Sequence, residues 1–395
     1  MAELNNKTLI WKLSVAGFIS AADNWVISPI LPAIASEFDI SITQAGAILT
    51  AYLIPYGIMQ PVYGFLSDCF GKAKLLQWIV AGLSLGTIGC FSANSLWILC
   101  FWRSVTGFFA AGIIAVSLAL IGDTVPISER QKYVGIFIGI VFLGQGLSAG
   151  LGGAFAKYIS WRTSFAFFAI AAACTVFLLK KLPPGMSIHT SHKFFSEINR
   201  VTRSPKGKVI FPLAFGAGFL LLGLYSYLGA FLHEMVELNY LQVGIVIMFF
   251  GFSCFLAGGQ VGKLEQRIGQ KETVIMGGYL ALFATVLLIM FPSWEAGCLA
   301  TISLGFGYIF IQSTLATIAF DVSSNSKGLP SALIGLGLFG GGGLGTLFNS
   351  WLLSISSYSI LWLTLGIGIF IFILVAAKFL LNKAGQNCSM VDNKH

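Results

Sequence analysis

Two ionisable residues lie deep inside otherwise apolar stretches of the sequence. Asp23 is the one acid, and Arg103 the one base, placed well within a hydrophobic run. Each costs about 2.5–3.5 kcal/mol at the centre of a membrane helix, so neither is expected to face lipid. Their depths along the two runs differ by about 5 Å, a gap that long side chains can bridge. We predict that they pair. In the functional interpretation Asp23 is a proton or ligand site whose charge is tuned by Arg103. In the structural interpretation the two form an ion pair without a role in transport, or helix carbonyls accept the hydrogen bonds of Arg103.

The composition places the chain in a membrane. Hydrophobic residues make up 56% of its 395 residues, charged residues only 10%, and the mean hydropathy is +0.86. Soluble domains carry about 25% charged residues. Long continuous apolar runs predict helices rather than a barrel, so the expected class is an all-α integral membrane protein. The net charge of +8 lies in short loops, which argues against a nucleic-acid partner.

Hydropathy predicts twelve spans in two groups of six. The spans are 9–33, 43–66, 75–94, 96–121, 133–156, 163–181, 209–233, 240–262, 273–291, 294–319, 330–353 and 359–381. The longest gap separates the groups. The expected organisation is a six-helix bundle over 1–181, a cytoplasmic linker over 182–208, and a second six-helix bundle with a short tail over 209–395.

Lysine and arginine are distributed unevenly between the two sides of these spans. With the N-terminus on the cytoplasmic side, twenty of them are cytoplasmic and two, Lys157 and Arg162, are external. Because positive charge collects on the cytoplasmic side, both termini are predicted to be cytoplasmic in a cell (plasma or inner) membrane.

A glycine-rich basic stretch joins the second and third spans, and it has a weaker copy half a chain later. Gly71 and Gly269 are 198 residues apart, which predicts two similar halves. The stretch resembles the loop signature of the major facilitator superfamily of transporters, G-x-L-x-D-x-x-G-x-R/K-x-R/K, although Cys69 replaces the usual base after the acid. The matching residues are Gly64, Leu66, Asp68, Gly71, Lys72 and Lys74.

This resemblance implies the major facilitator fold, with twelve transmembrane helices in two pseudo-symmetric six-helix bundles and a central cavity that opens to alternate sides. It also implies that the stretch is a gating loop. Asp68 would contact the opposite half and stabilise the outward-open state, and Gly64 and Gly71 would be turn or close-packing positions. The sequence from Asp23 to Phe38 resembles the first helix of drug and sugar efflux members, and Arg103 and Gly107 match a fourth-helix signature, R-x-x-x-G.

The fifth span is similar to the antiporter signature of the same superfamily, G-x8-G-x3-G-P-x2-G-G. Gly135, Gly144, Gly152 and Gly153 match it, but Ser148 and Ala149 replace the central Gly-Pro. The resemblance implies proton-coupled efflux by a secondary active transporter. The missing proline favours the alternative, a proton symporter or a facilitator that imports a small solute. Close helix packing by small residues explains most of these glycines by itself.

Polar and aromatic residues within the spans are candidates for the substrate cavity, although each is as readily a packed core residue with one hydrogen bond. These candidates are Asn24, Tyr52, Gln145, Tyr225, Tyr308 and Gln312. An aromatic content of 14% with few charges at this depth favours an apolar or amphipathic small molecule. The expected partners are this substrate, protons and the bilayer, and the expected state is a monomer. No metal spacing, cofactor motif or catalytic cluster supports an enzyme or a receptor.

Overall fold

The computed structural model describes residues 2–380, except for 181, 184–193, 321 and 323–327. The side chains of residues 2–5, 68, 69, 127 and 131 also lie outside this description. Every regular element in the described part of the chain is a helix. Eleven of the described helices are long and apolar enough to cross a membrane, or twelve when a pair bent by 45° is counted as one span. The predicted class and number of spans are therefore confirmed.

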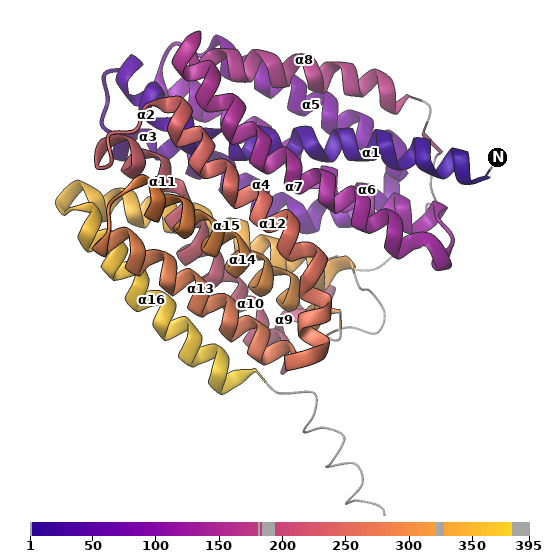
Figure 1. The fold of residues 1–395 in the computed structure, drawn as a ribbon. Helices are drawn as coiled ribbons and strands as arrows, with labels where there is room; N and C mark the ends of the chain where they lie inside the picture. Colours follow the sequence, from indigo (N-terminus) through magenta and orange to yellow (C-terminus); the bar gives the residue numbers. More distant parts are fainter. Residues whose placement is uncertain (1, 181, 184–193, 321, 323–327, 381–395) are drawn as a thin grey trace, which may run out of the picture.

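The N-terminal elements are the indigo-to-magenta helices of Figure 1. They are α1 (Ala2–Trp25), α2 (Ile27–Glu37), α3 (Ile42–Ala45), α4 (Ala47–Phe70), α5 (Lys72–Ser92), α6 (Leu96–Thr124), α7 (Ile127–Tyr158) and α8 (Trp161–Leu179). The C-terminal elements are the pink-to-yellow helices. They are α9 (Phe194–Arg203), α10 (Gly207–Ala217), the π-helix η1 (Gly218–Leu222), α11 (Gly223–Glu234), α12 (Tyr240–Ile268), α13 (Gln270–Met290), α14 (Trp294–Ala319), α15 (Gly328–Ile355) and α16 (Tyr358–Phe379).

The first span is broken rather than continuous. Helices α1 and α2 meet at an angle of 45°, next to Asp23. Pro29 explains the break, because it lacks a backbone N–H and its ring collides with the carbonyl four residues earlier, that of Trp25. The Trp25 carbonyl, which the proline leaves without a helical donor, accepts a hydrogen bond from the hydroxyl of Tyr225 at 3.4 Å. The break therefore brings polar backbone atoms to the middle of the membrane span.

The internal repeat is visible in the backbone. Gly71 and Gly269 have φ angles of 81° and 93°, and they are the only glycines with positive φ among the described residues. Each ends a long helix and begins the next, α4 to α5 and α12 to α13. The expected gating loop is therefore wrong as a loop, because only Gly71 breaks the helical path. Nothing between Gly64 and Phe70 interrupts a helix, so α4 continues after its apolar run has ended.

A second pair of matching contacts lies where α2 and α11 end. The indole N–H of Trp161 donates to Glu37 at 2.6 Å, and the hydroxyl of Tyr358 donates to Glu234 at 2.6 Å. Both pairs join residues 124 positions apart, and the two acids are 197 positions apart. These contacts fasten α2 to α8 and α11 to α16, each within its own half.

We call the end of the bundle with the Gly71 and Gly269 turns the basic end, and the end with the α2–α3 and α11–α12 turns the far end. The two most extensive seams between the halves are α4 against α15 and α7 against α12, and α2 also packs against α11 and α12. At the far end they are closed by hydrogen bonds and by close backbone contact. The hydroxyl of Ser350 donates to the carbonyl of Thr43 at 2.6 Å, and an added Cβ on Gly153 would lie 2.9 Å from the Cα of Gly244.

Both seams come apart toward the basic end. On α4, Gln60 still touches Gly335, but one helical turn further no described residue has an atom within 4 Å of an added Cβ on Gly64. On α7, Gly139 still meets Phe255, whereas Gly135, one turn further, has no such neighbour in the described part of the chain. The expectation that Gly64 is a turn or close-packing position is therefore wrong for this state, in which the halves are closed at the far end and separated at the basic end.

Candidate functional site

Asp23 and Arg103 form a buried ion pair, as their depths predicted. A single guanidinium nitrogen of Arg103, Nη1, lies 2.9 Å from Oδ2 of Asp23 and 3.1 Å from the carbonyl oxygen of the same residue. The side chains are 0% and 1% exposed. The hydroxyl of Thr87 lies 3.1 Å from the other carboxylate oxygen, Oδ1. Helices α1, α5 and α6 thus each supply one member of the cluster, beside the break in the first span.

The rest of the guanidinium rests on aromatic rings. Its central carbon lies 4.2 Å from the ring centre of Tyr52 and 5.9 Å from that of Phe165. Such cation–π contacts stabilise a buried cation, by about 2 kcal/mol when the site is dry. The Nε and Nη2 atoms have no oxygen acceptor among the described residues. The thiol of Cys90 interacts with the Arg103 side chain. Tyr52 thus supports the ion pair, and its place in a substrate cavity stays a prediction.

A row of rings leads from the ion pair to the opposite half. Tyr52 stacks on Tyr56 with ring centres 5.5 Å apart, and Tyr56 meets Phe339 of α15 at 4.4 Å. Tyr52 and Tyr56 lie one helical turn apart on the same face of α4. Three successive contacts, Arg103 to Tyr52, Tyr52 to Tyr56 and Tyr56 to Phe339, therefore connect the guanidinium to a helix of the C-terminal half.

A second aromatic cluster lies across the halves beside the break. Trp25 meets Tyr225 at 4.6 Å, Phe250 at 5.2 Å and Tyr308 at 6.2 Å between ring centres. Tyr225 and Tyr308 are two of the predicted cavity residues, and the structure brings them together. Sequence reasoning missed Trp25 and Phe250, although the position of Trp25, two residues after the buried acid, was a usable signal. We refer to these four rings as the central aromatic cluster.

Of the other predicted cavity residues, Asn24 and Gln145 are buried and Gln312 is half-buried. Gln145 is 3% exposed, and its Nε2 has no hydrogen-bond partner within the described part of the chain. The same holds for Oε1 of Gln312, while Asn24 is 8% exposed. Asn349 of α15, which sequence reasoning missed, is fully buried, and neither of its amide atoms has a partner among the described residues. These side-chain amides therefore hold donor and acceptor atoms inside the bundle that no described residue bonds.

The basic stretch around Gly71 forms an ion pair within the N-terminal half. The ammonium of Lys72 lies 2.9 Å from Oδ2 of Asp123 at the end of α6, and the two side chains are 5% and 17% exposed. Lys74 lies in the first turn of α5 and is exposed. The side chain of Asp68 lies outside the described residues, so its gating role stays a prediction.

Comparison with known proteins decides the family. Residues 13–336 match the family model described as Major Facilitator Superfamily. The chain belongs to this superfamily. It is therefore a secondary transporter in a membrane, and not an enzyme.

Curated relatives of this superfamily member differ in how much of their length it matches. It is 37% identical over 164 residues to the multidrug resistance protein fnx1 of Schizosaccharomyces pombe, covering 42% of this chain but only 31% of fnx1. It is 24% identical over 343 residues to the uncharacterised MFS-type transporter YceJ of Bacillus subtilis, covering 85% of this chain and 87% of YceJ.

Solved structures show the same fold at low sequence identity. The nucleoside transporter NupG matches with a TM-score of 0.77 at 12% identity, over 94% of this chain and 100% of NupG. A bacterial homologue of the lysosomal transporter Spinster, in an inward-facing conformation, matches with a TM-score of 0.69 at 17% identity, over 95% and 96% of the two chains. The major facilitator fold expected from the sequence is thus confirmed.

A glycine contact in the α7–α12 seam gives a test of the closed far end. A Cβ on Gly251 would lie 2.2 Å from the backbone nitrogen of Gly146, so Gly251→Ala must push the two helices apart. Overpacking typically costs 1–3 kcal/mol, so the variant should shift the population about tenfold toward opening at the far end. The measurement is labelling of a cysteine introduced at Thr43, which keeps the backbone carbonyl that accepts from Ser350, in a background without the native cysteines, from the far side of sealed vesicles.

The matched control for this variant is Gly277→Ala, whose Cβ would lie 2.8 Å from the carbonyl of Gly307 inside the C-terminal half. It carries a similar clash but does not touch a seam, so labelling should stay at the level of the parent. Equal labelling of the Gly251→Ala variant and its parent would show that this seam does not hold the far end closed.

Proposed function

We propose that this transporter exports a small apolar or amphipathic compound in exchange for protons, with Asp23 as the proton-binding residue. The observation that carries the proposal is the fully buried Asp23–Arg103 pair at the broken first span. Breaking one member of a buried pair leaves an uncompensated charge, so a change in protonation at Asp23 has a large energetic consequence. A residue with that property can bias which state of the transporter is populated.

Thr87 allows the site to hold Asp23 in either protonation state. Its hydroxyl lies 3.1 Å from Oδ1 of Asp23 and 2.8 Å from the carbonyl of Leu83. When Asp23 is a carboxylate, the hydroxyl donates its one hydrogen to it. When Asp23 carries a proton, the hydroxyl can donate to Leu83 and accept from Asp23 instead. The hydrogen bonds of Asp23 and Thr87 are therefore satisfied in either protonation state, and the cost of protonation falls on the charge of Arg103.

The position of Asp23 links this proton to the transport path. Two residues later, Trp25 enters the central aromatic cluster, whose other three rings belong to the opposite half. Protonation weakens the attraction to Arg103 and so loosens the end of α1 that places Trp25. Because the cluster bridges the halves, this change alters a contact made in the present state, and differential contact is what shifts a two-state equilibrium.

The substrate class follows from the residues around this path. Tyr225, Tyr308, Trp25 and Phe250 offer ring faces and hydroxyls without a charged side chain among them, which suits an apolar or amphipathic molecule. The printed name of fnx1, a multidrug resistance protein, agrees with export of such compounds by a relative.

Orientation and assembly complete the proposal. The basic end lies on the cytoplasmic side of a cell membrane, because it carries nearly all lysines and arginines of the loops. With the far end closed, the structure then corresponds to an inward-facing state of a monomer. The alternative, import by symport or facilitated diffusion, draws its support from Ser148 and Ala149 in place of the Gly-Pro of the antiporter signature.

Purified protein in liposomes with an imposed pH gradient tests the proposal. With the protein's basic end inside and the lumen alkaline, an antiporter should drive fluorescent amphipathic dyes outward against their gradient, and a protonophore should stop this. Accumulation in the direction of proton flow would show symport. Dye movement that only equalises concentrations, unaffected by the pH gradient, would show a facilitator and contradict proton coupling.

A further inference from the structure

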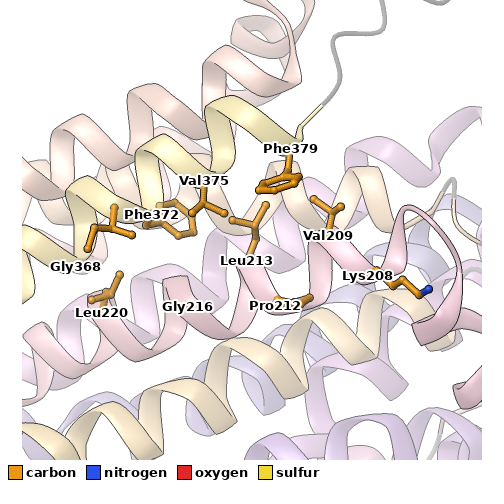
Figure 2. A pocket seen from close by; sticks show the side chains of 11 residues that line it. Lys208, Val209, Pro212, Leu213, Gly216, Leu220, Gly368, Phe372, Val375 and Phe379 are labelled. Atoms are coloured by element: carbon orange, nitrogen blue, oxygen red, sulfur yellow. The ribbon is translucent and has the colours of Figure 1, made fainter.

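An apolar groove lies between α10 and α16, away from the seams and from the central aromatic cluster. It has a volume of about 550 Å³. Figure 2 shows its lining side chains in a row along the two helices, with Lys208 at one end and Gly368 and Leu220 at the other. Ile371, Val375 and Phe379 are about half exposed, so in a membrane protein this surface faces the bilayer.

One glycine leaves the hollow open, and a second closes its end. Among the described residues, a Cβ on Gly216 would meet just the ring of Phe372, at 3.7 Å, so the space beside α10 is empty at this level. At Gly368 an added Cβ would lie 2.6 Å from the side chain of Leu220, so the two helices pack closely there and the groove ends. Leu220 belongs to the π-helix η1, and such bulges widen a helix locally. The groove is therefore built into the backbones of both helices.

The length of the groove matches one leaflet of a bilayer. From Lys208 to Leu220 it follows twelve residues of α10 and η1, or about 18 Å at the rise of a helix. Half of a typical hydrocarbon core is about 15 Å. Lys208 lies at the start of α10, where the span begins at the basic end, so its ammonium stands at the depth of lipid headgroups.

The mouth of the groove is positively charged. Lys208 is the one charged residue among the eleven that line it, and it is exposed. The preceding helix α9 has Arg200 and Arg203 in its last turn, and Lys378 of α16 lies 5.4 Å from the ring of Phe379. Glu197 of α9 is paired with Arg200. Basic groups beside a membrane attract anionic lipids.

We propose that this groove is a binding site for an anionic phospholipid of the leaflet at the basic end. One acyl chain lies along Gly216 and Gly368, and the phosphate pairs with Lys208. The bound chain fills the gap between α10 and α16 and so stabilises the packing of the helix that leads through η1 to Tyr225. This inference concerns a lipid rather than the transported compound, and it holds whatever the coupling ion is.

The test is lipid retention measured by native mass spectrometry, after the purified protein is equilibrated with equal amounts of dioleoyl-phosphatidylglycerol and dioleoyl-phosphatidylcholine. The wild type should retain one phosphatidylglycerol in about fivefold preference, since one lysine near the surface contributes about that factor. Lys208→Gln should remove the preference. Gly216→Leu should remove the bound lipid of either type, because its side chain fills the groove without a backbone clash.

Matched controls make the same changes elsewhere. Lys263→Gln removes an exposed lysine of α12, and Gly122→Leu adds a side chain on α6 where none of the described residues lies within 4 Å of an added Cβ. Both should retain lipid as the wild type does. Equal retention of the two lipids by the wild type would overturn the role of Lys208, and unchanged retention in Gly216→Leu would overturn the groove as the site. Lys208 is exposed, so its variant tests the idea even if Gly216→Leu folds poorly.

Discussion

Asp23→Asn should abolish transport driven by a pH gradient, while the protein still folds and inserts. It should be less stable than the wild type but more stable than Arg103→Ala, because Arg103 keeps the backbone carbonyl of residue 23 and the ring of Tyr52 as partners. The amide has the size of the carboxyl. Its oxygen can accept from Arg103, and its NH2 can donate to the hydroxyl of Thr87, which then donates to the carbonyl of Leu83, so the local packing is kept. It cannot take up and release a proton. Net dye transport against a gradient in liposomes should therefore fall to the level of liposomes without protein.

Two comparisons make this result specific. Exchange of labelled for unlabelled dye at equal pH should persist in Asp23→Asn, because exchange needs binding and the movement of the halves but no net proton transfer. Glu37→Gln is the matched control, since it makes the same change of acid to amide at the far end, in the contact with Trp161. Uphill transport by Asp23→Asn at the wild-type rate would make Asp23 a structural residue.

The fold could be predicted from the sequence because the bilayer constrains it so strongly. Apolar runs of the length of a membrane and the 198-residue offset of Gly71 and Gly269 fix the number of spans and the repeat. The helix ends were less predictable. The apolar run ends at Leu66, but α4 continues to Phe70, because a helix needs no apolar residues once it has left the lipid. The break at Trp25 was missed for the opposite reason, since a proline inside an apolar run does not change its hydropathy.

A site residue could be predicted only where placing it inside a membrane costs a large free energy. Asp23 and Arg103 stood out by their charge, and their depths predicted the pair. Thr87 did not stand out, since a threonine in a spanning helix ordinarily bonds to its own backbone, as this one also does to Leu83. Phe250 looked like any aromatic residue of a core. Its place beside Trp25 depends on how two halves of the chain pack, which no local pattern encodes.

Arg103→Ala should be the most destabilising single change at this site. It leaves the carboxylate of Asp23 buried without its cation, and breaking one side of a buried pair typically costs 3–5 kcal/mol. Arg103→Lys should be milder but not neutral. A lysine keeps the charge, but it loses the planar group that rests on Tyr52 at 4.2 Å. Thermal unfolding of the purified variants in one detergent should therefore rank the wild type first, Arg103→Lys second and Arg103→Ala last.

The double variant Asp23→Asn/Arg103→Gln separates stability from coupling. Removing both charges removes the uncompensated one, so its unfolding temperature should lie close to that of the wild type and well above that of Arg103→Ala. Its pH-driven transport should nevertheless be absent, because no proton-binding group is left in the pair. If Arg103→Ala unfolds at the wild-type temperature, the two residues do not stabilise each other. If the double variant still transports dye uphill, the proton must bind elsewhere in the protein.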